Sequence, residues 1–352
     1  MLHRLLSGEY RSWAAATARC GLAAMTPFYG GAVAARNLLF DLGIRRSKLL
    51  PRPAISVGNL SVGGTGKTPM VIDLVRRLVA GGQRPAVLLR GYRGGAGGSD
   101  EAILLASATD GAPVEADPDR AAAARAVLDR DPKISVFVLD DAFQHRQVRR
   151  DLDIVLVDAA MPMSLARLLP RGLLREPLRG LCRADAVVIT HAEQADRTTL
   201  EELDRLVERI AGKPPLGHAE HRWNGYRTAD EGKLPLDALA AASVFAFCGI
   251  ANPAAFARMA RTHVGRVLDL CVYADHHPYA DVAGLERLRQ RAAGAGADFL
   301  LTTEKDWVKL RGRRDLVSQL PPIVRPQLTM AFLDGEAQLE ALLRGVGEGR
   351  EE

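Results

Sequence analysis

The sequence predicts an α/β protein with a mostly parallel sheet covered by helices on both faces, plus a second, smaller α/β lobe. Short apolar runs alternate with helical patterns from residue 53 onward. The runs are continuously apolar rather than alternating, which is typical of parallel strands buried on both faces. At roughly 150 residues per domain, the length also favours two domains. A polar, weakly patterned stretch over 217–236 separates two such series of elements.

Five predicted strands form the first series: Ala54–Val57, Ala86–Leu89, Ile134–Leu139, Ile154–Val157 and Ala186–Ile189. Helical patterns between them include Lys67–Ala80 and Arg120–Leu128. The second series consists of the strands Val244–Phe247, Val267–Val272 and Phe299–Leu301 and of helices near Pro253–Thr262 and Val282–Ala293. The expected segments are therefore an N-terminal basic and apolar segment (1–52), a first α/β domain (53–216), a linker (217–236), a C-terminal α/β lobe (237–324) and a final segment with a frayed tail (325–352).

The composition is that of an ordinary soluble globular protein, with 25% charged and 47% hydrophobic residues among 352. It excludes a disordered chain, a collagen-like repeat and a polytopic membrane protein. The four cysteines have no CxxC or zinc-like spacing. We therefore expect reduced thiols and a cytoplasmic setting.

The positive charge lies at the N-terminus. The whole chain carries +5, while residues 1–52 hold eight basic and two acidic side chains, so the other 300 residues sum to −1. A nucleic-acid-binding face spread over the protein is therefore disfavoured, and a local anionic partner is favoured.

The first twenty residues predict an amphipathic helix. Its apolar positions recur at spacings of three and four, and they are Leu2, Leu6, Tyr10, Trp13, Ala16 and Cys20. Its arginines fall on another face, at Arg4, Arg11 and Arg19. Such a helix suits an anionic membrane surface, and a helix packed on the protein's own core fits the pattern equally well. The apolar stretch Cys20–Ala35 is too short to span a bilayer, and Pro27 with Gly30 and Gly31 predicts a break in any single helix there.

The sharpest motif is a glycine-rich loop between a strand and a helix, Ser56-Val-Gly-Asn-Leu-Ser-Val-Gly-Gly-Thr-Gly-Lys-Thr-Pro69. In this context Gly63, Gly64 and Gly66 let backbone N–H groups approach phosphates. Lys67 would reach the β- and γ-phosphates, and Thr68 would bind Mg²⁺. The strict P-loop pattern is missed only at Ser61, where its first glycine would stand.

Paired carboxylates end a neighbouring predicted strand, in Ile134-Ser-Val-Phe-Val-Leu-Asp-Asp141. The carboxyl ends of parallel strands meet at one edge, so Asp140 and Asp141 are expected beside the phosphate loop. Either carboxylate can hold Mg²⁺ or its water shell. The two motifs together predict a nucleotide-binding enzyme that uses ATP and Mg²⁺.

Seven motifs in chain order resemble those of the tetraacyldisaccharide 4'-kinases of lipid A biosynthesis. Besides the phosphate loop they are Arg90-Gly-Tyr92, Asp140-Asp-Ala-Phe-Gln-His145, Leu169-Pro-Arg-Gly-Leu-Leu-Arg-Glu-Pro177, Ala246-Phe-Cys-Gly-Ile-Ala-Asn-Pro253, Asp275-His-His-Pro-Tyr279 and Thr302-Thr-Glu-Lys-Asp306. The resemblance implies a P-loop kinase lobe joined to the smaller lobe by a two-stranded ribbon, whose second strand returns after about Val324. It also implies transfer of the γ-phosphate of ATP to the 4'-hydroxyl of a tetraacyldisaccharide 1-phosphate at the cytoplasmic face of the inner membrane.

The resemblance also implies roles for individual residues. Lys67, Thr68, Asp140 and Asp141 match the family's phosphate-loop and metal residues, with Thr65 in the loop itself. His145 matches its active-site histidine, and Arg175 and Glu176 match an Arg-Glu pair near the nucleotide. Asp100 matches the aspartate that activates the acceptor hydroxyl, although Ser99 stands where the family has glycine. His276 matches a histidine that assists from the second lobe. No role follows for Thr303, Glu304 and Asp306.

Two other functions remain open from the sequence. The Gly-Gly-Thr-Gly-Lys-Thr core also resembles switch ATPases of the ArsA/MinD type, which act on a protein or membrane partner, but Val62 stands where these carry a signature lysine. The third possibility is a carboxylation or amide-forming enzyme related to dethiobiotin synthetase. A soluble small-molecule enzyme would have no need of the apolar, basic N-terminus.

Overall fold

The computed structural model describes Leu6, Tyr10 and residues 12–91, 100–109, 111–275, 277–279, 281–312 and 320–346. The chain divides into two compact units. Unit 1 comprises residues 1–92, 109–221 and 330–352, and unit 2 comprises residues 93–108 and 222–329. The division departs from the predicted domain 53–216 at one helix, α4 (Asp100–Ala108). This helix packs against α9 (Glu304–Leu310) and so groups with unit 2.

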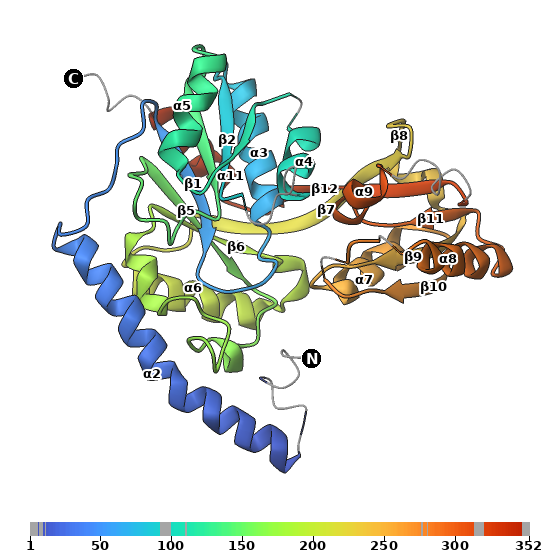
Figure 1. The fold of residues 1–352 in the computed structure, drawn as a ribbon, viewed down its shortest axis with the longest axis horizontal. Coiled ribbons are helices and arrows are strands. Elements are labelled where there is room, and N and C mark those ends of the chain that lie inside the picture. The colour runs from blue at the N-terminus through green and yellow to red at the C-terminus, as the bar shows by residue number, and fades with distance from the viewer. Residues whose placement is uncertain are drawn as a thin grey trace. The chain divides into compact units, whose positions relative to one another are not determined.

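Unit 1 is built on a parallel sheet with the strand order β3-β2-β4-β1-β5-β6-β7 (Figure 1). The strands are β1 (Ala54–Asn59), β2 (Pro85–Leu89), β3 (Val114–Ala116), β4 (Val136–Asp140), β5 (Leu152–Asp158), β6 (Ala186–Thr190) and β7 (Gly217–Thr228). β1 lies centrally, with Val57 in register with Asp140 of β4 and with Ile154 of β5. This register brings the end of β1 and the paired carboxylates to the same edge.

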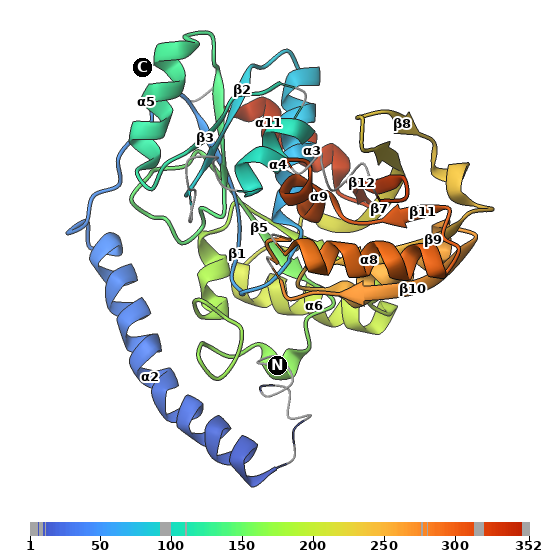
Figure 2. The same ribbon diagram turned by 45° about the vertical axis from the view of Figure 1, so that its right-hand side comes forward.

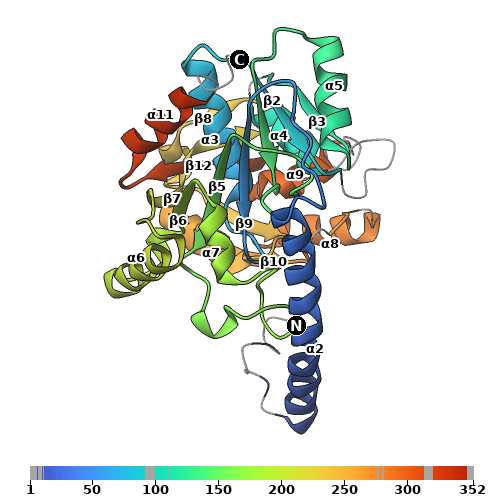
Figure 3. The same cartoon turned by 90° about the vertical axis from the view of Figure 1, so that its left-hand side faces the viewer.

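Helices cover both faces of this sheet. α3 (Lys67–Ala80) and α11 (Glu336–Gly345) lie on one face, joined by ion pairs from Arg77 to Glu336 and Glu340. α5 (Arg120–Arg130) and α6 (Arg197–Ala211) lie on the other, where they pack on Phe137 of β4 and on Val187 of β6. Figure 3 shows α5 at the upper right of the view and α6 at the lower left. Short 3₁₀ turns complete the unit at Met163–Leu165, Leu178–Arg183 and Ala192–Gln194.

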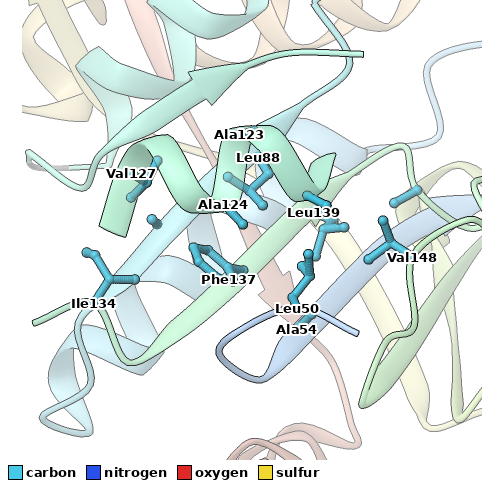
Figure 4. Packing of buried hydrophobic residues seen from close by; sticks show 13 residues of the cluster. Leu50, Ala54, Leu88, Ala123, Ala124, Val127, Ile134, Phe137, Leu139 and Val148 are labelled. Carbon is cyan, nitrogen blue, oxygen red and sulfur yellow. The ribbon is translucent and has the colours of Figure 1, made fainter. Parts of the chain in front are cut away.

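The core beneath α5 shows why small residues are needed there. Ala121, Ala123 and Ala124 of this helix bring its backbone close to Leu88, Phe137 and other strand residues (Figure 4). Asp119 caps the helix by accepting hydrogen bonds from the backbone N–H groups of Ala121 and Ala122. The alanine-rich sequence therefore gives both a strong helix former and a flat packing surface.

Unit 2 has a second parallel sheet, in the order β10-β9-β11-β12. Its strands are β9 (Ser243–Cys248), β10 (Arg266–Val272), β11 (Phe299–Leu301) and β12 (Ile323–Phe332), and β8 (Lys233–Leu234) pairs with β7. α7 (Pro253–His263) packs on the β9 face that carries Val244 and Ala246. α8 (Val282–Gly294) and α9 pack on the Phe245 and Phe247 face, and Figure 2 shows α8 lying along this sheet. A 3₁₀ turn, Leu236–Leu239, precedes β9.

Two strands carry the chain between the units. β7 leaves unit 1 after His221 and β12 re-enters it at Met330. They are hydrogen-bonded neighbours, so they form the two-stranded ribbon implied by the family resemblance. The fold class, a mostly parallel α/β architecture with a second α/β lobe, is confirmed. Every strand and helix predicted from residue 53 onward is present, with ends displaced by at most two residues.

The N-terminal predictions were wrong in two respects. The helix predicted over the first twenty residues is not continuous, since Tyr10 lies outside any helix and Ser12 caps a helix that begins at Trp13. Residues 13–41 form one helix, α2 (Trp13–Asp41), which contains Pro27 and both glycines that predicted a break (Figure 1). Pro27 is exposed, so water can reach the Ala23 carbonyl that loses its intrahelical partner. Tertiary contacts after Pro27, described below, hold the second half of the helix. Leu2, Arg4 and Arg11 of the predicted amphipathic helix lie outside the described residues.

Within the described ranges, no helix is both long and apolar enough to cross a membrane. The four cysteines are free, as their spacing predicts.

Candidate active site at the phosphate loop

The phosphate loop joins β1 to α3 through two residues in unusual backbone conformations. Gly63 has φ +129° and Gly66 has φ +87°, a region that only glycine enters at little cost. A Cβ on Gly66 would also lie 2.7 Å from Nε2 of His221. In the described part of the chain no side chain caps α3 at this end. The first N–H groups of α3 therefore form a ready site for an anion.

Buried polar contacts hold the loop in place. Asn59 Nδ2 donates to the hydroxyl of Thr65 at 2.8 Å, and Thr65 is itself 2% exposed. The hydroxyl of Thr190, at the end of β6, donates to the Thr65 carbonyl at 2.9 Å. Lys67 Nζ donates to Asn59 Oδ1 at 3.3 Å. The loop conformation thus depends on two strands that lie far apart in the sequence.

Lys67 and the paired carboxylates meet as predicted. Asp140 ends β4 and is 5% exposed, while Asp141 turns the chain with φ +49°. Lys67 Nζ lies 3.5 Å from Asp141 Oδ1, and Arg175 Nη1 donates to both oxygens of Asp141 at 2.9 and 2.8 Å. Burial alone would raise the pKa of Asp141, but Lys67 and Arg175 outweigh it, so the pKa lies below its ordinary value.

Glu176, next to Arg175, is a buried acid surrounded by donors. Its carboxylate accepts hydrogen bonds from Arg183 at 2.8 Å, Gln144 at 2.9 Å and Asn37 of α2 at 3.2 Å. Its side chain is fully buried, so these donors are needed to offset its lost hydration. Glu176 thereby ties α2, the loop after β4 and the turn Leu178–Arg183 to one point.

His145 follows the paired carboxylates in the same loop. Burial, with the positive charges of Arg120 and Arg90, lowers the pKa of His145 to about 4. Its imidazole is therefore neutral near pH 7 and can accept as well as donate a hydrogen bond.

The two residues predicted to act on the acceptor hydroxyl are Asp100 and His276. Asp100 is the first residue of α4, in unit 2, while Lys67, Asp141 and Arg175 lie in unit 1. His276 lies outside the described residues, as do Tyr92 and Ser99. Thr68, the second residue of α3, follows Lys67 directly at the end of the loop.

The Thr-Glu-Lys-Asp segment, for which no role was predicted, makes structural contacts in unit 2. Thr303 caps α9 and donates through its hydroxyl to Asp306 at 2.6 Å. Asp306 also accepts from the Gly249 N–H at 3.1 Å, which joins the ends of β11 and β9. Glu304 pairs with Arg325, which is 1% exposed.

Sequence reasoning missed several residues that shape the site: Tyr29, Asn37, Asn59, Gln144, Arg183 and Thr190. Asn59 and Gln144 fall inside the quoted motifs, and Asn59 was an available signal because it is a polar side chain at the end of an otherwise apolar strand. Tyr29 and Asn37 lie on one face of α2, but the predicted helix break hid their shared spacing.

Comparisons with known proteins agree on one family. Residues 18–347 match the family model described as tetraacyldisaccharide-1-P 4'-kinase. The chain is 37% identical to the tetraacyldisaccharide 4'-kinase of Geobacter sulfurreducens, with 97% of each chain covered. It is 38% identical to that of Geobacter metallireducens over 89% of this chain and 94% of the relative.

A solved structure supports the same assignment. The crystal structure titled as the "apo" form of LpxK from Aquifex aeolicus in complex with ATP matches with a TM-score of 0.74 and 30% identity. The match covers 94% of this chain and 99% of that one. These relatives disfavour both the switch-ATPase and the dethiobiotin-synthetase alternatives. By sequence, fold and phosphate loop, this chain belongs to the tetraacyldisaccharide 4'-kinase family.

Proposed function

We propose that this protein transfers the γ-phosphate of ATP to the 4'-hydroxyl of a tetraacyldisaccharide 1-phosphate, forming the 1,4'-bisphosphorylated lipid A precursor. In this step the hydroxyl oxygen bonds to the γ-phosphorus, the bond to the β-phosphate oxygen breaks, and the hydroxyl proton leaves. The observation that carries the proposal is the open phosphate loop, whose Lys67 is held by Asp141 and Asn59 in a chain of this family.

The donor set fits ATP with Mg²⁺. Gly63 and Gly66 leave the backbone free of side chains where phosphates would approach, and α3 begins there. Mg²⁺ usually binds through one or two carboxylates, waters and substrate phosphates. Asp140, Asp141 and the hydroxyl of Thr68 are the groups that would hold it. When bound, the ion would neutralise charge on the transferring phosphoryl group.

The remaining chemistry is mostly positioning and charge neutralisation. We assign Lys67 to the β- and γ-phosphates, and Arg175 and His145 to the nucleotide beside them. Glu176 holds the loop that carries Arg175. Asp100 is the proposed acceptor of the hydroxyl proton, and His276 is proposed to assist it from the second lobe; both roles rest on the family motifs.

We also propose that the enzyme works at the anionic cytoplasmic face of the inner membrane. Residues 1–52 hold eight basic and two acidic side chains, a net charge of +6 against +5 for the whole chain. α2 exposes apolar side chains, including Trp13 at 89% and Phe28 at 74% exposure. Apolar burial combined with basic residues is the usual basis of interfacial binding. A high-salt wash is therefore expected to release only part of the protein from membranes, whereas complete release would contradict the apolar contribution.

The test uses γ-labelled ATP, Mg²⁺ and detergent-dispersed tetraacyldisaccharide 1-phosphate. We expect label in the lipid fraction, and none when the acceptor lacks its 4'-hydroxyl. Label recovered only as inorganic phosphate would sink the kinase assignment, and equal labelling of the 4'-deoxy acceptor would show that another oxygen is phosphorylated.

A further inference from the structure

Helix α2 has two chemically different sides. Its exposed side is apolar and includes Phe28 and Leu38, each more than half exposed. Its inner side carries Tyr29, Val33 and Asn37, spaced by four residues, and Val33 is 8% exposed. At about 100° per residue, the two sets lie on opposite sides of the helix. The helix is therefore able to contact a lipid surface and the protein at the same time.

The inner side touches the active-site loop directly. The hydroxyl of Tyr29 donates to the carbonyl of Arg175 at 2.8 Å. Asn37 Nδ2 donates to the buried carboxylate of Glu176 at 3.2 Å. Arg175 in turn donates hydrogen bonds to both carboxylate oxygens of Asp141. Two adjacent loop residues are thus fixed from α2, and one of them holds the carboxylate that pairs with Lys67.

The loop after β4 contacts the same helix. Arg146, five residues after Asp141, donates to the Asn37 carbonyl at 3.1 Å and to Asp41 at 2.7 Å. Its guanidinium lies over the Phe40 ring at 5.3 Å from the centroid. The C-terminal half of α2 therefore contacts both loops that meet at Asp141. A helix that served only to anchor the protein would have no need of contacts at this point.

Burial strengthens the Tyr29 link. Partial burial raises the pKa of Tyr29, so its hydroxyl keeps its proton and remains a donor across the working pH range. The acceptor is the backbone carbonyl of Arg175, which moves only when the backbone moves. The hydrogen bond therefore constrains the position of the loop backbone.

We propose that α2 is a positioning helix. Tyr29 and Asn37 hold Arg175 and Glu176 so that Arg175 pairs with Asp141, and seating of the apolar side on a lipid surface fixes that arrangement. The occupant is a lipid surface because the exposed residues are apolar while the flanking Arg45, Arg46 and Lys48 are exposed cations. This inference rests on the proposed lipid-kinase function and adds that the membrane contact sets the turnover rate as well as the encounter with substrate.

The first test removes a single hydroxyl. Tyr29→Phe is expected to lower kcat on lipid acceptor in anionic vesicles by about fivefold, the effect of one lost hydrogen bond, with KM for the lipid unchanged. Tyr10→Phe is the matched control, because Tyr10 lies in the same N-terminal segment, is 40% exposed and contacts Arg19 through its backbone carbonyl. The control should keep the parental kcat. An unchanged kcat in Tyr29→Phe would overturn the proposal.

The second test separates positioning from anchoring. Phe28→Ser, on the opposite side of α2, is expected to weaken vesicle binding and raise KM for the lipid. Asn37→Leu is expected to behave like Tyr29→Phe, with normal vesicle binding and a kcat lowered by about fivefold. If Asn37→Leu raised only KM, or if it lost vesicle binding as Phe28→Ser does, α2 would be an anchor alone.

A double-mutant cycle shows whether the effect passes through Arg175. In an Arg175→Lys background, Tyr29→Phe should cause almost no further loss of kcat, because the contact of the guanidinium Nη1 with Asp141 is already gone. Full additivity of the two losses of kcat would contradict the inference that Tyr29 acts through Arg175.

A measurement of nucleotide binding distinguishes failure of this inference from failure of the proposed function. The affinity for ATP with Mg²⁺, measured by calorimetry with and without anionic vesicles, should rise on vesicles in the parent chain and in Tyr10→Phe. The rise should be absent in Tyr29→Phe. If no lipid is phosphorylated but this pattern holds, the kinase assignment fails and the coupling stands. If transfer occurs and vesicles do not change the affinity in any variant, the coupling fails alone.

Discussion

Two carboxylates at the carboxyl edges of the two parallel sheets differ in burial and in the groups that surround them. Asp141 follows β4 in unit 1, and its side chain is 29% exposed between Lys67 and Arg175. Asp306 follows β11 in unit 2, and its side chain is fully buried. It is bound by the Thr303 hydroxyl and the Gly249 N–H, with Lys309 at 3.9 Å. In both units polar side chains gather at the carboxyl edge of the sheet. Only the cluster around Asp141 is partly exposed, so only there can the cationic side chains bind a ligand.

The largest expected effect falls on the open cluster. Lys67→Met should lower transfer by roughly a thousandfold, because a cation facing the phosphates is lost in a partly buried site. The measurement is kcat/KM for labelled ATP, with Lys133→Met as control, since Lys133 is exposed on the surface. Activity within tenfold of the parent chain would mean that the loop does not bind phosphate as assigned.

The closed cluster should show the converse. Asp306→Ala should lower the free energy of unfolding by about 3 kcal/mol, since it strands the buried Lys309 and the Gly249 N–H. ATP binding by the folded protein should be unchanged. The control is Asp281→Ala, which removes an exposed helix cap in the same unit and should cost about 1 kcal/mol. Equal losses in urea denaturation for the two variants would show that burial does not distinguish Asp306.

An intermediate effect is expected at the second cation of the open cluster. Arg175→Lys keeps the charge but loses the contact with both oxygens of Asp141, so kcat should fall about tenfold. Arg179→Lys, an exposed neighbour, should leave the rate unaltered. Identical kinetics for the two variants would imply that charge alone is needed at position 175.

The smallest effect is a pH dependence that should differ between the units. The pKa of His145 is about 4 in the folded chain, below the ordinary 6.5, so the unfolded state binds more protons between these values. Unit 1 should therefore lose stability as pH falls from 6.5 to 4. Burial raises the pKa of Glu304 in unit 2, so its contribution to stability is present below the ordinary pKa and is lost as pH rises. Hydrogen exchange resolved by peptide at pH 7 and pH 5 checks this, and faster exchange confined to unit 2 at pH 5 would contradict it.

Local patterns were enough to predict the elements but not the contacts between them. The helix Lys67–Ala80 was predicted with its observed ends, because a glycine loop precedes it and Gly81 follows it. The Lys67–Asp141 pair was also foreseeable, since neighbouring parallel strands end at one edge. Thr190 could not be foreseen, because its bond to Thr65 depends on the position of β6 in the strand order. The same holds for α2: Pro27 predicts a break, and contacts from residues 146, 175 and 176 overrule that local preference.

Gly66 has a practical consequence for protein engineering. Its missing side chain leaves room for His221 and Met330, which lie 2.7 and 3.3 Å from where a Cβ would stand. These are the residues at which the chain leaves and re-enters unit 1. A chimera that borrows the second lobe of a relative should therefore be spliced beyond both, after residue 221 and before residue 330. A junction placed one residue further inward would replace His221 or Met330, which contact the phosphate loop, by the relative's residue.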